Sequence, residues 1–158
     1  MEPLLPAPAP LRPQLITDLG VLSFINTGLF LLLYGLCMLV IPMIQSLPRE
    51  EFDAQFAPLL NANFEGAELE DMRAFLDVMY EHGAGLMFIL FLRTGLRLTG
   101  VLGMWRGRMW GFHVYAAAQL TGIFAPHLFL PWKFMGIGGP LLAVAMTAVY
   151  GTQRRFLS

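Results

Sequence analysis

The chain has 158 residues, of which 56% are hydrophobic and only 13% are charged, and its mean hydropathy is +0.61. Soluble domains carry about 25% charged residues, so this composition favours a chain that is surrounded mostly by lipid. The net charge of −1 excludes a generally basic nucleic-acid-binding protein. The single cysteine, Cys37, excludes a disulfide within the chain.

The first 17 residues are predicted to form a flexible, proline-rich tail in the cytoplasm. Five prolines between positions 3 and 13 oppose a helix and favour extended polyproline II structure. No charged stretch is followed directly by a short apolar one here, so we do not expect a cleavable signal peptide.

An uncharged run at 19–44 predicts the first membrane span. Thr17 and Asp18 can cap its start, and Pro42 and Pro48 are expected to end it. At ~1.5 Å per residue, a helix of this length exceeds the ~30 Å hydrocarbon core of a bilayer.

The segment 46–82 is the only sizeable polar stretch, with nine acidic residues against two arginines. Pro48 followed by Arg49-Glu50-Glu51 predicts the start of a short helix. A second helix is predicted at 66–80 because one apolar face recurs at helical spacing, formed by Leu69, Met72, Leu76 and Met79. This second helix either lies on the bilayer or runs straight into the next span. The segment is too short for a separate core.

Three further apolar runs predict three more spans, at 83–104, 110–130 and 134–151. Pro126 is expected to kink or end the third span, and Gly138-Gly139-Pro140 to interrupt the fourth early. A short cytoplasmic tail, 153–158, follows. The predicted fold class is therefore all-α: a polytopic membrane protein whose domain, 18–152, is a four-transmembrane-helix bundle with a short amphipathic helical loop.

The arginines predict the orientation of this bundle. The turn 105–110 contains two arginines and the C-terminus contains two more, whereas the loop 46–82 is strongly acidic. The positive-inside rule then places both termini and the turn 105–110 in the cytoplasm, and the acidic loop in the periplasm, of a bacterial inner membrane. Tryptophans are expected at both interfaces, at positions 105, 110 and 132.

Small residues recur every four positions on two of the predicted spans. The second span carries Gly95, Thr99 and Gly103, and the fourth carries Gly139, Ala143, Thr147 and Gly151. Such stripes let helix backbones approach closely in lipid, so these residues are predicted to be helix-packing positions. The packing partner could belong to the same chain, to a second copy or to another membrane subunit.

Two arginines inside the second span are the main candidates for a functional site. Arg93 and Arg97 are four residues apart on one helix face, ~18 Å and ~12 Å from Trp105 along the helix axis. Counting along each span predicts a polar layer in the inner half of the membrane, formed by Asn26, Arg93, Arg97, Gln119 and Thr147.

No predicted span contains an aspartate or glutamate that could pair with these arginines. The remaining partners are amides, backbone carbonyls, a lipid phosphate, an anionic solute or a carboxylate of another protein. In the purely structural interpretation, Arg97 reaches the cytoplasmic surface and Arg93 bonds to Gln119 or Asn26.

Two histidines near the predicted periplasmic face, His82 and His127, suggest a different site. Paired histidines at one level could hold a haem or a metal, and Glu81 could add a carboxylate. Their spacing matches no known metal motif, and histidines are common at membrane interfaces, so neither a cofactor nor a metal is predicted. Catalytic motifs such as HExxH, GxSxG and the Walker A loop are missing from the sequence, so an enzyme is not expected.

The turn and the two spans that flank it carry a resemblance to a known group of proteins. The residues concerned are Arg97–Gly100, Met104–Arg108, Gly111-Phe112, Tyr115 and Gln119. They resemble a pattern in small uncharacterised four-span inner-membrane proteins of bacteria, over roughly a quarter of the chain. The resemblance implies the four-span topology and carries no activity.

These observations favour a non-catalytic integral membrane subunit or scaffold, which packs against itself or against a larger membrane complex. One alternative is a small transporter or channel for a polar or anionic solute, based on the two arginines and the interrupted fourth span. The other is a haem- or quinone-linked redox subunit, based on the two histidines. The expected partners are the lipid bilayer and other membrane subunits or a second copy, and not nucleic acid.

Overall fold

A computed structural model describes residues 14–158, and this part of the chain is entirely helical, without strands. Its five α-helices are α1 (Gln14–Gln45), α2 (Arg49–Asn63), α3 (Gly66–Trp105), α4 (Met109–Phe124) and α5 (Gly138–Thr152). Short 3-10 turns follow α4, precede α5 and follow α5, at Ala125–Leu128, Trp132–Phe134 and Arg154–Phe156. The predicted all-α class is thereby confirmed. The proline-rich segment predicted to be a flexible tail lies outside the described residues, up to residue 13.

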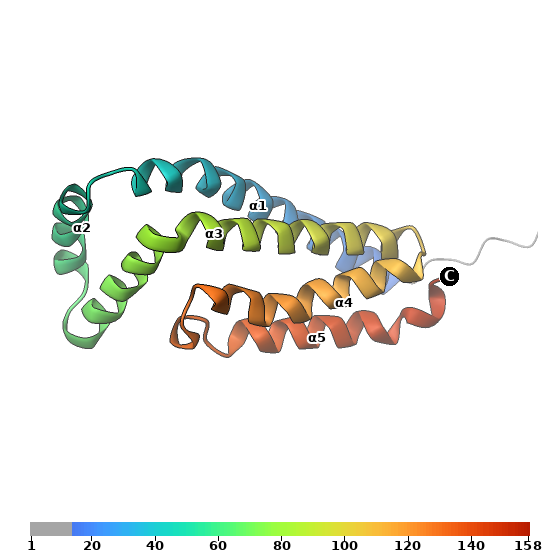
Figure 1. Cartoon of the computed structure of the whole chain (residues 1–158). Coiled ribbons are helices and arrows are strands. Elements are labelled where there is room, and N and C mark those ends of the chain that lie inside the picture. Colours follow the sequence, from blue (N-terminus) through green and yellow to red (C-terminus); the bar gives the residue numbers. More distant parts are fainter. Residues whose placement is uncertain (1–13) are drawn as a thin grey trace, which may run out of the picture.

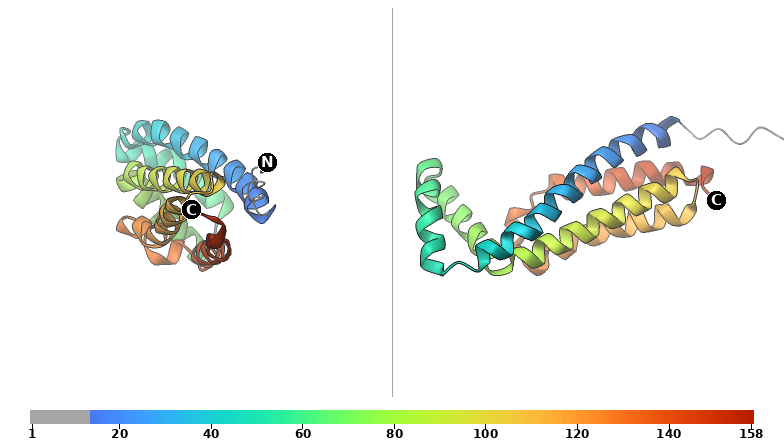
Figure 2. Two further views of the ribbon diagram at one scale, coloured as in Figure 1. Left: turned by 90° about the vertical axis from the view of Figure 1, so that its right-hand side faces the viewer. Right: turned by 90° about the horizontal axis from the view of Figure 1, so that it is seen from above.

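Four of the helices run alongside one another, and α2 lies across one end of them (Figure 1). α3 is central because it packs against both α1 and α4, whereas α5 packs mainly against α4. The start of α1, the turn between α3 and α4 and the C-terminus all lie at the end opposite α2 (Figures 1 and 2). The connection between α4 and α5 lies nearer the α2 end, where Lys133 pairs with Asp71 of α3 at 2.6 Å.

α1 is longer than the predicted first span at both ends. It begins at Gln14 rather than near Leu19, and it continues through Pro42 to Gln45. The predicted end at residue 44 is thus correct to within one residue, with Pro42 inside the last turn and Pro48 just beyond the helix. A proline removes one backbone N–H donor, and here the carbonyl of Pro42 still accepts a bond from the Ser46 N–H at 3.1 Å.

α3 is a single helix of 40 residues, so the predicted amphipathic helix 66–80 runs straight into the second span. At ~1.5 Å per residue it is ~60 Å long, about twice the thickness of a hydrocarbon core. Its first turns project beyond the other long helices and pack beside α2 (Figure 2). The acidic segment is therefore a two-helix cap at one end of the molecule.

α4 and α5 are shorter than the predicted third and fourth spans. α4 ends at Phe124, and Pro126 lies in the 3-10 turn that follows. α5 begins at Gly138, four residues later than expected, because Gly136 turns the chain at a φ of 62° and Pro140 fits only in a first helical turn. Of the helices in residues 14–158, α1 and α3 are the two that are long and apolar enough to cross a membrane.

The end of the molecule that carries the start of α1 and the C-terminus is tightly packed. Its buried cluster joins four helices and the C-terminal residues, and it consists of Ile16, Val101, Met104, Tyr115, Tyr150 and Leu157. The C-terminal Ser158 pairs with the α3–α4 turn: its N–H donates to the Gly107 carbonyl at 2.8 Å, and its own carbonyl accepts from the Met109 N–H at 2.9 Å. These bonds fix the last residues of the chain beside the basic turn.

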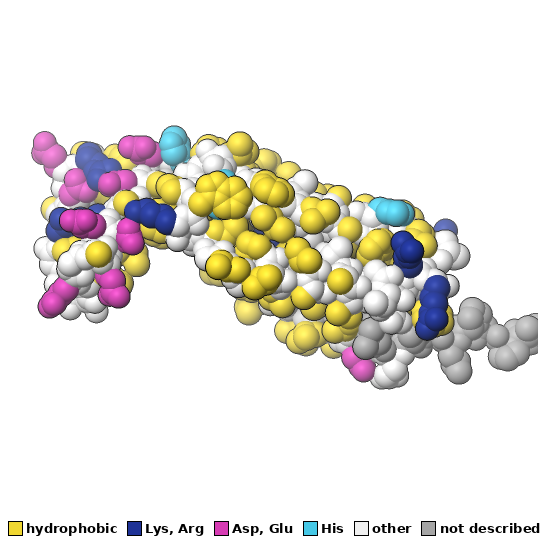
Figure 3. Space-filling view, turned by 90° about the horizontal axis from the view of Figure 1, so that it is seen from below, with side chains coloured by type: hydrophobic (Ala, Val, Ile, Leu, Met, Phe, Trp, Pro, Cys, Tyr) yellow, Lys and Arg dark blue, Asp and Glu magenta, His cyan; other side chains and the backbone are white. Residues whose placement is uncertain are grey.

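The surface between the two ends of the molecule is apolar. Only 11% of the most hydrophobic stretch of α1 and 22% of that of α3 are buried, whereas the core helix of a soluble protein is mostly buried. On the face that Figure 3 shows, hydrophobic side chains cover the middle of the molecule, and charged side chains gather at its two ends. An apolar belt between two charged ends supports an association with a membrane.

Candidate functional site

The two arginines of α3 face α4, where they meet an amide and a phenol. The guanidinium group of Arg93 donates a long hydrogen bond to the Gln119 side-chain carbonyl at 3.4 Å. The amide of Gln119 donates in turn to the Tyr115 hydroxyl at 3.0 Å, and Gln119 is only 3% exposed. Arg97, one turn further along α3, also interacts with the Tyr115 side chain. The helix spacing of four therefore brings both arginines to one row of α4 residues.

Gly122 makes room for Arg93 on the surface of α4. A β-carbon at position 122 would overlap the Arg93 side chain at its Nε, Cδ and Cζ atoms. Gly122 lies three residues after Gln119, hence on the same helix face. Gly122 was not among the predicted site residues, although a glycine one turn from a glutamine inside an apolar run is a signal that could have been used.

Each arginine keeps an unused hydrogen-bond donor. The Nε atoms of Arg93 and Arg97 are buried and have no hydrogen-bond partner among residues 14–158. Within the same residues, neither guanidinium group forms an ion pair. Two phenols, those of Tyr34 on α1 and Tyr115 on α4, interact electrostatically with both arginines. The site is thus cationic, with donor capacity left for an anion, a carbonyl or a phosphate.

A chain of buried polar side chains continues from this site across the bundle. The ring of Tyr115 meets that of Tyr150 on α5 edge-on, with centroids 4.9 Å apart. The Tyr150 hydroxyl lies 3.1 Å from the Ser23 hydroxyl on α1, and Thr27 donates to the Ser23 backbone carbonyl. Sequence reasoning did not place Ser23, Thr27 or Tyr150 in the site, because it considered only amides, arginines and Thr147.

The predicted polar layer forms only in part. Arg93 and Gln119 are in contact, whereas Asn26 lies on the exposed side of α1 and Thr147 bonds to the Ala143 carbonyl of its own helix at 2.8 Å. The interpretation that Asn26 joins this layer inside the bundle is therefore corrected. Counting residues gives the height of a side chain along a helix but not its angle about the axis. Ser23 and Thr27 occupy the inner face, which turns Asn26 outward.

The closest helix contact uses glycines of α3 and α4. A β-carbon at Gly103 would lie 2.7 Å from the Cα atom of Gly111, and one at Gly100 would lie 2.6 Å from the Tyr115 nitrogen. Of the predicted packing positions, Gly103 is thus at a close contact, and Ala143 is buried. Three others make no such contact among residues 14–158. A β-carbon added at Gly95 or Gly139 would have nothing within 4 Å, and one at Gly151 would make an ordinary contact with Phe112; the Thr99 side chain is exposed.

The two histidines occupy different environments near the α2 end. Nδ1 of His127 lies 2.8 Å from the Leu130 carbonyl oxygen, to which it donates, and Nε2 lies 3.1 Å from the Met135 sulfur, a thioether that has no proton to donate. Its ring also stacks on Trp132, with centroids 3.5 Å apart. The ring of His82 stacks on that of Phe129, and its Nε2 lies 3.8 Å from the Glu81 carboxylate oxygen Oε2. In the neutral imidazole of His127, Nδ1 therefore carries the proton, and Nε2 is the one nitrogen with a lone pair.

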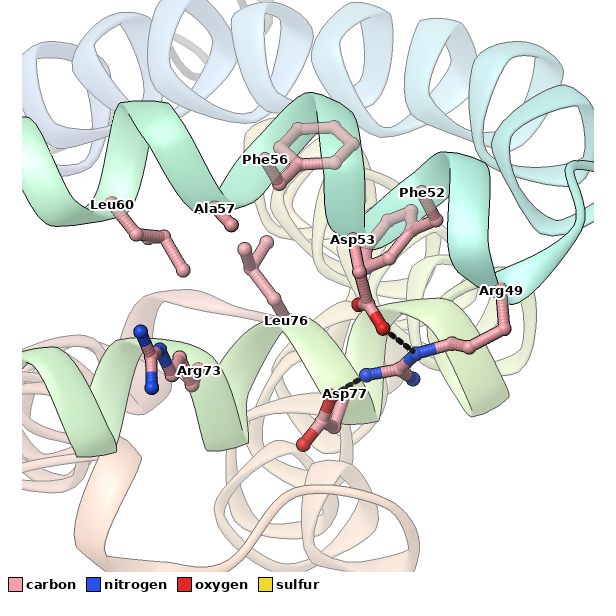
Figure 4. A pocket seen from close by; sticks show the side chains of 9 residues that line it. All are labelled: Arg49, Phe52, Asp53, Phe56, Ala57, Leu60, Arg73, Leu76 and Asp77. Carbon is pink, nitrogen blue, oxygen red and sulfur yellow. Dashed lines mark hydrogen bonds and ion pairs between the residues drawn. The ribbon is translucent and has the colours of Figure 1, made fainter.

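A cleft lies in the cap, between α2 and the first part of α3 (Figure 4). Its volume is about 300 Å³. Apolar side chains of the two helices face each other across it, and an arginine stands at each end (Figure 4); its lining residues are Arg49, Phe52, Asp53, Phe56, Ala57, Leu60, Arg73, Leu76 and Asp77. The cleft combines an apolar wall with a charged rim.

Arg49 closes one end of this cleft. Its guanidinium group donates to Asp77 of α3 and, at 3.0 Å, to Asp53 of its own helix. The bond to Asp77 and, to a lesser extent, the bond to Asp53 raise the pKa of Arg49 above its usual value. The guanidinium group therefore stays charged at any accessible pH. The guanidinium also lies over the Tyr80 ring, 5.1 Å from the centroid. Arg49 thus ties α2 to α3.

The chain was compared with models of protein families, with curated proteins and with solved structures, and no match was found in any of the three. The resemblance to small four-span inner-membrane proteins therefore stays an expectation from the sequence. The function has to be argued from the geometry of the chain itself.

Proposed function

We propose that this protein is a four-span integral membrane protein of the bacterial inner membrane that acts as a non-catalytic subunit or scaffold. In this proposal α1, α3, α4 and α5 span the bilayer, and the acidic cap of α2 and the first part of α3 faces the periplasm. α4 and α5, at ~24 Å and ~22 Å, are supplemented by the 3-10 turns that adjoin them. Both termini and the basic turn 106–108 are then cytoplasmic.

The observation that carries the subunit role is the contact of Arg93 with Gln119 and Gly122. A charge within a hydrocarbon layer is expensive, and a site for a solute would have to keep it accessible. Here the guanidinium group lies against a glycine of the neighbouring helix and bonds to a buried amide, which supports a role in holding α3 to α4. What remains for interaction is the extensive apolar outer surface of the bundle.

A pull-down from native membranes tests this role. We expect the affinity-tagged chain, solubilised in mild detergent, to co-purify in a fixed ratio with another membrane protein or with itself. A matched control is an unrelated tagged four-span protein at the same expression level. A chain that stays monomeric and partner-free, and that instead moves a solute when reconstituted, would contradict the subunit role.

Transport or binding of an anionic solute is the second candidate, and one observation favours it. The buried Nε donors of Arg93 and Arg97 have no partner in the described chain, so together they could bind an anion. Uptake of a labelled anion into liposomes containing the protein tests this candidate, with an Arg97→Gln variant as the control. Uptake that is equal for both proteins, or absent, would exclude it.

The redox alternative depends on a histidine that can bind iron, and only Nε2 of His127 could do so, because Nδ1 donates to the Leu130 carbonyl. It makes a direct prediction about purified protein. A haem absorption band that disappears in a His82→Ala variant would revive it.

A further inference from the structure

The outward face of α1 carries a repeat of seven residues. Its positions alternate at spacings of four and three, and all are exposed: Leu22, Asn26, Leu29, Leu33, Leu36, Val40 and Met43. The apolar members are between 47% and 71% exposed. A mean spacing of 3.5 residues is the pattern with which two helices pack side by side along a left-handed seam. The face of α1 that includes Thr27 and Ile41 is already buried in the bundle, and the exposed residues Ile25, Leu32 and Leu39 flank the row on the side away from that face.

Asn26 distinguishes this face from one that meets only lipid. Its side chain is exposed, and it has no hydrogen-bond partner among residues 14–158. In the hydrocarbon layer no water is present to bond the amide, so leaving it unpaired costs free energy. A side-chain amide both donates and accepts, so a second Asn26 is a complementary partner for it.

Membrane insertion determines how two copies would meet. Two copies inserted in the same orientation have parallel α1 helices. If a twofold axis along the membrane normal relates the copies, each seam residue lies beside the same residue of the other copy. Asn26 then faces Asn26, and the layers above it are formed by Leu29, Leu33 and Leu36. A single asparagine in such a seam, among leucine layers, fixes the register and the number of helices.

We propose that the chain forms a parallel homodimer through α1, in which the two Asn26 amides bond to each other across the twofold axis. This inference rests on the proposed function, because it requires α1 to span the bilayer. It names the partner of the proposed subunit as a second copy of the same chain.

Disulfide crosslinking in liposomes tests the seam. The variants Leu29→Cys and Leu142→Cys are made in a Cys37→Ser background, so each protein has one thiol. The two leucines are equally exposed, at 64%, but only Leu29 lies on the seam. We expect an oxidant to give a covalent dimer of Leu29→Cys that persists when the protein is diluted tenfold with lipid. Equal crosslinking at both positions, or none at Leu29→Cys, would overturn the proposal.

The role of the asparagine is tested by Asn26→Leu, with energy transfer between labelled copies measured over a range of protein-to-lipid ratios. Hydrogen bonds between membrane helices contribute roughly 0.6–1.7 kcal/mol, so we expect the dimer dissociation constant to rise about three- to twenty-fold. The exposed position leaves the fold of each copy intact. An unchanged dissociation constant would overturn the proposal.

These outcomes are separable from the failure of the proposed function. Thiol accessibility reports independently whether α1 spans the bilayer. A spanning α1 in a protein that stays monomeric, or that crosslinks through Leu29→Cys to a different membrane protein, would overturn the homodimer alone.

Discussion

At the scale of single residues, the fit between Arg93 and Gly122 decides how a charge is held within the apolar layer. The long Arg93 side chain lies across α4 only because position 122 has no β-carbon, and its guanidinium group then reaches Gln119. The glycine therefore makes space for the Arg93 side chain, and it is not needed for a close approach of two backbones. The arginine and the glycine form one unit and should respond to mutation as a unit.

We expect Gly122→Ala to destabilise the protein by about 1–3 kcal/mol, because the added methyl group overlaps the Arg93 side chain. Unfolding in mixed detergent micelles measures the change. Gly95→Ala is the matched control, because nothing lies within 4 Å of a β-carbon there. In an Arg93→Ala background, Gly122→Ala should cost much less. Strictly additive effects would show that the two residues do not act together.

Arg93→Gln should keep most of the fold, with a loss of about 1 kcal/mol or less. A glutamine amide can still donate to Gln119, at a lower desolvation cost than a guanidinium group. Arg93→Leu should cost about 1–3 kcal/mol, because it leaves the buried Gln119 carbonyl without a donor. The same unfolding assay compares the two variants. Equal losses for both would contradict a hydrogen-bonding role for Arg93.

At the scale of elements, α3 and α4 form the closest helix pair. Gly100, Gly103 and Gly111 bring the two backbones together next to the tight turn, and the C-terminus pairs with that turn through backbone hydrogen bonds. By contrast, α5 contacts mainly α4. The hairpin is therefore the rigid part of the bundle, and α5 is the helix whose small residues remain available for other contacts.

Substitution of the hairpin glycines should harm assembly. Gly111→Ala places a methyl group against Gly100 and Met104 of α3, so we expect a loss of about 1–3 kcal/mol. Gly139→Ala, with open space around it, should change stability by less than about 0.5 kcal/mol. Thermal unfolding of the purified variants measures both. If Gly139→Ala were the more damaging change, a contact made by α5 outside this chain would have to be considered.

The attachment of α2 should depend on its apolar side chains more than on its ion pairs. Phe52 is buried and packs between Phe56 and Tyr80, so Phe52→Ala should cost about 3 kcal/mol or more in the local opening of the cap. The Arg49 pairs are solvent-exposed, so Arg49→Ala should cost less than about 1 kcal/mol. Hydrogen exchange of the α2 amides measures both changes. A larger effect of Arg49→Ala would reverse this order.

At the scale of the whole molecule, charge separates the two ends. The basic turn, the C-terminal arginines and the start of α1 gather at one end, whereas the acidic cap of α2 and the first part of α3 occupies the other (Figures 1 and 3). The apolar belt between them has no charges on its surface except where α3 carries its arginines. The positive-inside rule uses this difference in charge between the two ends to predict the orientation of a membrane protein.

The proposed orientation can be tested with single thiols in a Cys37→Ser background. Glu68→Cys, in the cap, should react with a membrane-impermeant reagent added to intact cells, and Thr152→Cys, at the end of α5, should react only after the cells are opened. Both positions are exposed, so access is limited by the membrane alone. The reverse pattern would mean that the acidic cap is cytoplasmic.

The sequence by itself predicted what depends on local composition and spacing. Uncharged runs and proline positions located the helices, and the acidic and basic segments assigned α2 and the α3–α4 turn to opposite ends of the molecule. The contact of Arg93 with Gln119 was among the alternatives, because both residues lie at one height in the apolar layer. Height along a helix follows from counting residues, which needs no knowledge of the neighbours.

Only the tertiary structure decided which side chains meet, because this depends on the rotation of each helix about its axis. Ser23 and Thr27 turn inward and Asn26 outward, although these residues lie within four positions of one another. The packing glycines proved to include Gly100 and Gly111 rather than Gly95 and Gly139, because the crossing of α3 and α4 lies next to their turn. Composition fixes that a helix is apolar, but the crossing of two helices is set by the shapes of both surfaces.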